Sequence, residues 1–428
     1  MKKNQKEHKP ATSAQLLRAL NLGDAIAIGV GAVIGAGIFV VSGVAAGIAG
    51  PALIVSLLIA GLAATFNGLS SAQLAARFPT AGGTYEYAYE MLNSLAGFSA
   101  GWMYLVSKLA AGGVVALGFA FYLQRFFPSL DQHVTATVIV ILLLIANLAG
   151  IKKTGLLNRV IVSVTVLSLL YFVAAGWAVF ELENFRPFAP SGFLGIAQAS
   201  AVLFFAFTGY ARVATLGEEI KEPQRNIPRA IVGTLVISFL LYSLVLVLAL
   251  GAIGASGMSE SESPLFSAAQ TMHWPGVVTV IGIAAVSSML GVLLSQILGT
   301  SRMLFAMGRR GDLPQIFSKT GSRSKVPVYG ILFSGFAVLL TVWLGELTFV
   351  SQTVSFTILV YYGITNLSAL RLKAEERFLP RWISYFGLIL CLLMAISLPL
   401  NTILAGLILL AVGHLLRLLF RVKKRYKA

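Results

Sequence analysis

The chain has 428 residues, of which 57% are apolar and only 11% are charged. A water-soluble domain carries about 25% charged residues, so this composition excludes a soluble globular protein and indicates a polytopic membrane protein. The 32 lysines and arginines outnumber the 16 aspartates and glutamates, giving a formal net charge of +16. One cysteine and four scattered histidines predict no metal site and no cofactor.

A helix that crosses a bilayer needs about 20 mostly apolar residues. The apolar runs between polar breaks match this length repeatedly and predict twelve transmembrane helices. In chain order we expect them at 22–48, 52–76, 94–125, 133–150, 156–180, 193–216, 228–254, 275–307, 327–345, 348–370, 382–399 and 401–420.

The basic residues fall on one side of these predicted helices. Lysines and arginines precede the first helix and follow the fourth, sixth, eighth, tenth and twelfth, whereas the opposite side has only Arg125 and Arg186. The positive-inside rule then predicts that both termini are cytoplasmic, in a protein of the cell (plasma) membrane. We interpret the net charge as a cytoplasmic collar on anionic membrane lipid, not as a nucleic-acid surface.

The first predicted helix is rich in glycine, with Gly29, Gly31, Gly35 and Gly37 in the run GVGAVIGAGIF. Each glycine weakens a helix by about 1 kcal/mol relative to alanine. Two interpretations follow. Gly31 and Gly35 form a G-x-x-x-G that suits close helix packing, or the segment is unwound, which a membrane tolerates where backbone lines a cavity.

The sixth helix favours the unwound segment. Its run FFAFTGYARVATLGEEI places Thr208–Gly209 near the middle of the membrane. The first and sixth helices each begin a set of five, and an odd number of spans inserts the second set upside down. Interrupted helices at matching positions of inverted repeats are typical of secondary transporters, since freed N–H groups suit a carboxylate and freed carbonyls suit an ammonium group.

The predicted organisation follows from this symmetry. We expect a cytoplasmic N-terminal tail over 1–21, a first five-helix repeat over 22–180, a second, inverted repeat over 181–370, helices 11 and 12 over 371–420, and a basic cytoplasmic tail over 421–428.

Four ordered motifs carry a family resemblance. They are GAGIF (35–39), FPTAGGTYEYAYE (78–90), FFAFTGY followed by EEIKEPQRNIPRAI (218–231), and SRMLFAMGRRGDLP (301–314) followed by KVPVYG (325–330). The sequence resembles the amino acid–polyamine–organocation (APC) permeases from about Gly23 to Arg371. The resemblance implies an all-α integral membrane protein with the leucine-transporter fold: twelve helices, two inverted five-helix repeats, and broken helices 1 and 6.

The resemblance also implies a substrate site at the two breaks. The N–H groups of Ala36 and Gly37 would hold a carboxylate, and carbonyls near Val33, Phe205 and Thr208 would hold the amino group. Phe205 falls where the family often places an aromatic gate, although core packing would also explain it. The full set expected at the site is Val33, Ile34, Gly35, Ala36, Gly37, Lys108, Phe205, Phe207 and Thr208.

Two cations lie within predicted spans and are candidates for gating or coupling. Lys108, far from either end of its helix, is a functional hypothesis because a charge in the membrane is costly. A structural ion pair, a bond to backbone carbonyls or snorkelling to the interface would also explain it. Arg212 follows the second break, where a structural or gating brace or contact with the substrate would explain it. Ser287 and Ser288 are candidates for sodium coupling. We expect no cofactor other than a coupling ion, H+ or Na+, and exchange remains an alternative.

These features predict a secondary amino acid permease that works by symport or exchange on a small-molecule substrate. Repulsion from Lys108 and Arg212 favours neutral amino acids, and a permease or exchanger for polyamines or other organocations is the alternative. The scattered histidines and aspartates do not form a catalytic constellation, so we expect no enzyme. A channel would need a ringed filter, which nothing indicates. A monomer and a homodimer are both compatible with the sequence.

Overall fold

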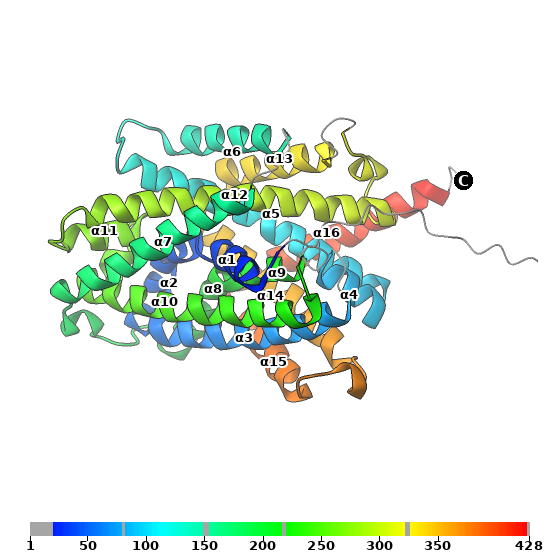
Figure 1. Ribbon diagram of the computed structural model, residues 1–428, viewed down its shortest axis with the longest axis horizontal. Helices are drawn as coiled ribbons and strands as arrows, with labels where there is room; N and C mark the ends of the chain where they lie inside the picture. The colour runs from blue at the N-terminus through cyan, green and yellow to red at the C-terminus, as the bar shows by residue number, and fades with distance from the viewer. Residues whose placement is uncertain (1–19, 79–81, 149–153, 216–219, 322–325, 426–428) are drawn as a thin grey trace, which may run out of the picture.

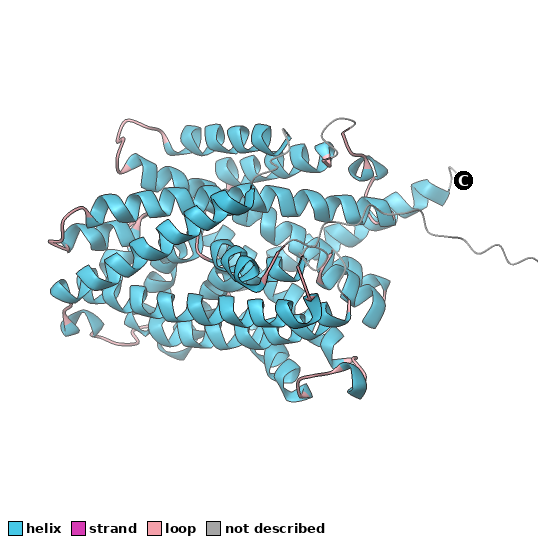
Figure 2. Ribbon diagram, in the orientation of Figure 1, coloured by secondary structure: helices cyan, strands magenta, loops and turns pink. Residues whose placement is uncertain are grey.

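The computed structural model describes residues 20–78, 82–148, 154–215, 220–321 and 326–425. Within these ranges every regular element is a helix, and the strand-like pairing is limited to one isolated bridge between Leu20 and Ile220 (Figure 2). The predicted all-helical class is therefore confirmed. Most of the predicted N-terminal tail, 1–21, and the end of the predicted basic tail, 421–428, lie outside the described residues.

In the described ranges, ten long helices and two interrupted ones make up the bundle (Figure 1). The long helices are α3 (Leu53–Arg77), α5 (Ser94–Gln124), α6 (Gln132–Leu148), α7 (Thr154–Gly176), α10 (Pro223–Ser259), α12 (Val277–Arg310), α13 (Val328–Leu344), α14 (Leu347–Leu370), α15 (Arg381–Ser397) and α16 (Leu400–Arg425). The interrupted helices are α1 (Leu22–Val33), η1 (Gly37–Val41) and α2 (Ser42–Ala49), and α8 (Gly192–Phe207), η5 (Thr208–Tyr210) and α9 (Ala211–Thr215). Two short helices, α4 (Thr84–Met91) and α11 (Pro264–Thr271), cap opposite ends of the bundle.

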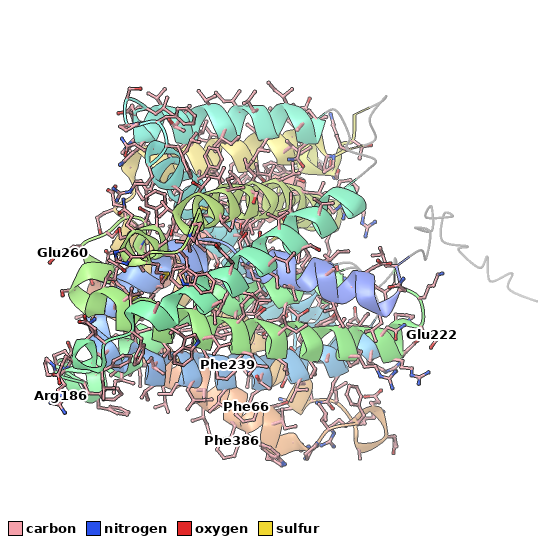
Figure 3. The ribbon with its side chains drawn as sticks, turned by 60° about the vertical axis from the view of Figure 1, so that its left-hand side comes forward. Phe66, Arg186, Glu222, Phe239, Glu260 and Phe386 are labelled. Carbon is pink, nitrogen blue, oxygen red and sulfur yellow. The ribbon has the colours of Figure 1, made fainter. Side chains whose placement is uncertain are left out.

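The apolar segments are long enough to cross a membrane many times. In the part of the chain that the structure describes, eight helical segments meet the length and hydropathy of a span, and three shorter apolar helices accompany them. Large apolar side chains are exposed on the outside, such as Ile396 (69%) and Leu419 (65%). Figure 3 shows Phe66 and Phe386 on one such outer face. Exposure of these apolar faces is unfavourable in water and favourable in hydrocarbon, as expected of a multi-pass membrane protein.

Helix α1 packs against three long helices, α10, α7 and α12. Its start is fixed by a reciprocal cap, because Asn21 Oδ1 accepts from Asp24 N at 2.9 Å and Asp24 Oδ2 accepts from Asn21 N at 3.1 Å. Further along, Gly29 packs against α10 so closely that a Cβ would lie 2.1 Å from Thr234 Oγ1. Close packing and an interruption therefore coexist in this helix, at Gly29 and after Val33 respectively.

A buried ion pair ties the outer helix α16 to the end of α12. Arg417 Nε lies 2.9 Å from Asp312 Oδ1, and the two side chains are 3% and 0% exposed. Tyr85 and Tyr89 of α4 both donate to Asp312 Oδ2, Tyr85 at 2.9 Å. The carboxylate therefore has a charged donor and two hydroxyl donors, and joins three elements that are far apart in the sequence.

Replacing Arg417 with methionine is expected to lower the free energy of unfolding by about 3–5 kcal/mol, because it leaves a buried carboxylate without this cation. The measurement is the thermal-unfolding midpoint of the detergent-purified protein. Arg417→Met combined with Asp312→Asn should lose less than the sum of the single changes. The matched control is Arg186→Gln, whose ion pair with Glu183 is 75% and 80% exposed, and it should change stability by less than about 0.5 kcal/mol. Equal midpoints for the Arg417 and Arg186 variants would contradict this.

Candidate functional site

The first interrupted helix loses its helical backbone in the middle of the bundle. Helix α1 ends at Val33, Ile34 is extended (φ −72°, ψ 110°), and winding resumes at Gly37 in η1. An interruption releases carbonyls at the end of one half and N–H groups at the start of the next from the helical ladder. The unwound segment predicted from the glycine run is therefore confirmed, and the glycine at its far side, Gly37, sits against Ala206 of α8.

The second interrupted helix changes its winding without opening. Helix α8 ends at Phe207, one 3-10 turn covers Thr208–Tyr210, and α9 continues from Ala211. The expected unwound segment is corrected here to a tightened turn. Its glycine meets the other break directly, because a Cβ on Gly209 would lie 2.1 Å from Ala32 O. The two interruptions are therefore in backbone contact, which only glycine permits at this position.

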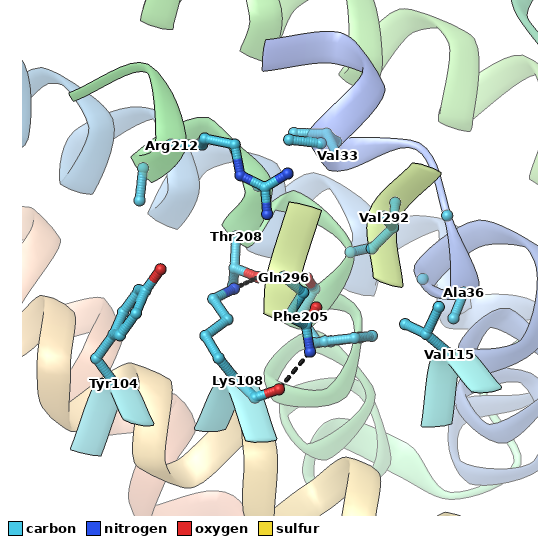
Figure 4. Close-up of a pocket in the computed structure, with 16 residues that line it drawn as sticks. Val33, Ala36, Tyr104, Lys108, Val115, Phe205, Thr208, Arg212, Val292 and Gln296 are labelled. Atoms are coloured by element: carbon cyan, nitrogen blue, oxygen red, sulfur yellow. Dashed lines mark hydrogen bonds between the residues drawn. The ribbon is translucent and has the colours of Figure 1, made fainter. Parts of the chain in front are cut away.

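A small cavity lies against both interruptions (Figure 4). The space open to the centre of a water molecule is about 30 Å³, which holds a few waters but not an amino acid. Its walls come from both interrupted helices, α5 and α12. The lining residues are Ala32, Val33, Gly35, Ala36, Gly37, Tyr104, Lys108, Val115, Phe205, Ala206, Thr208, Gly209, Ala211, Arg212, Val292 and Gln296.

Folding brings together most of the residues that the sequence placed at the site. Those that line the cavity are Val33, Gly35, Ala36, Gly37, Lys108, Phe205, Thr208 and Arg212. They come from three separate stretches of the sequence, two of them the predicted breaks and the third the middle of α5.

Lys108 projects from α5 toward the second interruption (Figure 4). Its side chain is 9% exposed, and its Nζ donates to Thr208 Oγ1 at 3.0 Å. The same Nζ lies 5.9 Å from the centre of the Tyr104 ring, within the range of a cation–π contact. Lys108 is therefore an interior lysine, and a lipid-facing or interfacial position is excluded for it.

Arg212 reaches the same cavity from α9. Its Nη1 donates to Ser295 Oγ of α12, and Ser295 Oγ in turn bonds to Gly291 O at 2.8 Å. This contact bridges the second interrupted helix to α12, as expected of a structural brace. Two basic side chains, Lys108 and Arg212, thus line one small cavity.

Four predicted residues lie outside the cavity lining. Phe207 is fully buried and packs its ring 5.4 Å from that of Tyr242. Ile34 is buried, and its carbonyl accepts from Ser288 Oγ at 2.7 Å, so Ser288 joins α12 to the first break from behind the cavity. Ser287 Oγ bonds within its own helix, to Ala284 O at 3.2 Å. Side-chain direction, which sequence position does not reveal, separates these residues from their lining neighbours.

Sequence reasoning missed Tyr104, Val115, Val292 and Gln296, all of which line the cavity. Two of them had a usable signal. Tyr104 precedes Lys108 by one helical turn, so the two share a face of α5. Gln296 is an amide in an apolar stretch of α12, and its Nε2 donates to Lys108 O. Val115 and Val292 are ordinary apolar residues, and no local pattern marks them.

The carbonyls at the two breaks already have partners inside the protein. Val33 O accepts from Tyr242 OH at 2.9 Å, Phe205 O from Thr208 Oγ1 at 2.9 Å, and Thr208 O from Tyr362 OH at 3.4 Å. Phe205 O also accepts from the N–H of Thr208, so both of its lone pairs are in use. Side-chain hydroxyls therefore stabilise the backbone at the two interruptions.

The sequence profile of a family described as amino acid permease matches residues 24–427. The chain belongs to the amino acid permease family. The resemblance noted from the four motifs is thereby confirmed over nearly the whole chain.

Individual relatives agree with this membership. An uncharacterized transporter of Mycobacterium tuberculosis is 39% identical to the permease over 401 residues, which cover 93% of this chain and 90% of the relative. The branched-chain amino acid permease BcaP of Bacillus subtilis is 30% identical over 443 residues, covering 96% and 95%. The vacuolar cationic amino acid transporter 2 of Arabidopsis thaliana is 31% identical over 395 residues, covering 86% of this chain and 62% of that protein.

The family match and the relatives show that the permease is a multi-pass amino acid transporter with a small-molecule substrate. They are transporters and not enzymes, so the prediction that the chain is no enzyme is confirmed.

Replacing Gly37 with valine is expected to abolish substrate binding by the permease. A Cβ at Gly37 would lie 2.5 Å from Ala206 Cα, so the branched side chain must force apart the two interrupted helices. The measurement is a thermal-shift screen of the purified protein against the twenty amino acids. The matched control is Gly291→Val on α12, where the nearest atom to a Cβ is 3.7 Å away. Retention of the wild-type shift by a folded Gly37 variant would count against this site.

Proposed function

We propose that this permease is a secondary active transporter of neutral amino acids that works by alternating access around the cavity. The observation that carries the proposal is the backbone contact between the two interruptions at Ala32 and Gly209, beside a cavity with backbone polar groups on its wall. A zwitterion needs donors for its carboxylate and acceptors for its amine within a few ångströms. Two interrupted helices in contact supply both.

The proposed poles of the site follow from helix direction. The N–H groups of Ala36 and Gly37 begin the second half of the first helix, at a positive dipole end that suits the carboxylate. The carbonyls of Val33, Phe205 and Thr208 would accept from the amine, Phe205 O in exchange for its bond from Thr208 Oγ1. The substrate's side chain would then lie against Val115 and Val292, and Phe205, which lines the cavity, would close over it as the gate.

Charge favours a neutral substrate. Lys108 and Arg212 line the cavity, and among its described lining residues there is no aspartate or glutamate. A second cation on the substrate would therefore be repelled by the Lys108 amine. This also disfavours the alternative of a polyamine or organocation permease. The relatives' names include both a branched-chain amino acid permease and a cationic amino acid transporter, so the charge on this cavity is the argument that separates them.

We propose twelve spans for the membrane topology. The first apolar segment, Leu22–Arg77, contains both the first interrupted helix and α3 and so counts twice, which gives nine; the three shorter apolar helices complete twelve. The first ten would form two inverted five-helix repeats, with α15 and α16 outside them. Basic residues then face the cytoplasm, with both termini, in the plasma membrane.

We propose that transport does not depend on sodium. Ser288 Oγ and Ile34 O, two oxygens that a sodium ion between α1 and α12 would use, bond to each other at 2.7 Å. A proton gradient or an exchanged amino acid would then drive the cycle.

The substrate proposal is tested by counterflow in proteoliposomes preloaded with unlabelled amino acid. Labelled leucine is expected to accumulate transiently. Excess external leucine, valine or isoleucine should abolish the signal, because their side chains carry no charge for Lys108 to repel. Excess lysine or putrescine should leave it unchanged. Accumulation of labelled lysine that leucine fails to compete would overturn the neutral assignment, and absence of counterflow for all twenty amino acids would overturn the transport mechanism.

Replacement of external sodium by choline is expected to change the initial rate of uptake by less than about twofold, since no cation other than a proton is proposed to bind. The measurement uses the same proteoliposomes, with choline chloride at equal ionic strength. The matched variant is Ser288→Ala. It should lower the stability of the fold, but its rate of uptake should still not depend on sodium. Uptake that vanishes without sodium would contradict the proposal.

A further inference from the structure

We propose that the amino group of Lys108 takes the place of the substrate's amino group when the permease is empty, and that this lets the empty protein complete its cycle. The inference rests on the proposed function, because it concerns the same cavity.

The position of the lysine amine is the first observation. Lys108 Nζ donates to Thr208 Oγ1 at 3.0 Å, and Thr208 Oγ1 donates to Phe205 O at 2.9 Å. The lysine amine therefore lies at the second interruption, one hydroxyl group away from Phe205 O, a carbonyl proposed to hold the substrate's amine. A substrate amine that binds there would compete with the lysine amine for this end of the cavity.

The second observation is the lack of space. A volume of about 30 Å³ for water centres holds a few waters but no amino acid, so something must move when substrate enters. The backbones at Ala32 and Gly209 are already in contact. The four-carbon side chain of Lys108 can instead rotate away at the cost of a rotamer change.

The contacts of Lys108 allow its amine to be displaced reversibly. Its backbone is fixed, because Gln296 Nε2 donates to Lys108 O and joins α5 to α12. Its amine, in contrast, donates to a neutral hydroxyl, and among the described residues around the cavity there is no carboxylate. A buried pair with a carboxylate would be costly to break, whereas a neutral hydrogen bond is exchanged for another at little net cost.

A consequence for transport follows. To cycle without substrate, the permease must close around a cavity with polar walls, and unfilled polar space inside a membrane protein is unfavourable. Lys108 fills that space and gives Thr208 a donor, so it stabilises the closed empty state. The loaded state does not need it, because the substrate supplies the amine. Lys108 should therefore support the return of the empty permease, and hence net transport, but not exchange.

The experiment compares net uptake with exchange in proteoliposomes, using the amino acid that gives the largest counterflow with the unsubstituted permease. Net uptake starts with no internal substrate and requires empty return, whereas counterflow does not. For Lys108→Ala we expect net uptake to fall at least about tenfold more than counterflow does. Ethylammonium at millimolar concentration should restore net uptake in this variant, because it fits the vacated space and supplies the missing N–H groups.

Further variants separate the amine from the volume. Lys108→Met keeps most of the stem without a donor, and we expect the same loss of net uptake with no rescue by ethylammonium, since the space is filled. Lys319→Met, at an exposed lysine remote from the cavity, is the control and should match the unsubstituted permease. Choline chloride at equal ionic strength controls for salt.

The outcomes are distinguishable. An equal fall of net uptake and counterflow in both Lys108 variants would overturn the inference and make the lysine part of substrate binding. Unchanged net uptake, or restored net uptake with choline as well as ethylammonium, would also overturn it. Absence of counterflow in the unsubstituted permease for every amino acid would instead refute the proposed function, and this inference with it.

Discussion

The backbone contact between Ala32 and Gly209 is the constraint on which the rest of the structure depends. It joins the break in the first helix to the tightened turn in the second, so polar groups from both lie around one small cavity. A side chain at Gly209 would part the helices and separate those groups. The glycines of the two motifs are therefore needed for approach as much as for flexibility. The permease thus keeps its interrupted backbone where protein surrounds it.

Unsatisfied backbone inside a membrane is costly, and the structure limits that cost with hydroxyl groups. Tyr242, Ser288 and Tyr362 reach the break carbonyls from three neighbouring helices. Each donor leaves its carbonyl with a second lone pair, so the breaks are stabilised and still able to bind. This combination suits a transporter, which must hold its empty and loaded states at similar free energy. A break whose carbonyls had all their hydrogen bonds would not bind a substrate. A break whose carbonyls had none would be too costly to keep open in the membrane.

The buried charges divide between two tasks. Asp312 and Arg417 are paired with each other at one end of the bundle, where they tie α16 and α4 to the end of α12. Lys108 instead donates to the neutral hydroxyl of Thr208, inside the cavity. A buried ion pair with a carboxylate is costly to break, whereas a hydrogen bond to a neutral oxygen can be exchanged for another at little net cost. The choice of partner thus separates the charges that hold the fold from a charge that can move.

The sequence by itself determined the features that depend on local chemistry. Apolar runs indicated a helical membrane protein, and the glycine run together with the sixth helix indicated an interruption within the first helix. The lone lysine in α5 was placed in the interior, and the four ordered motifs indicated the family that the comparisons established. Only the tertiary structure decided which side chains face the cavity: it excluded Ile34 and Phe207, added Tyr104 and Gln296, and replaced the second expected unwinding with a 3-10 turn. The physical reason is that helix formation follows from each segment's own residues, whereas the direction of a side chain is set by how neighbouring helices are rotated against one another, and that rotation is a property of the assembled bundle.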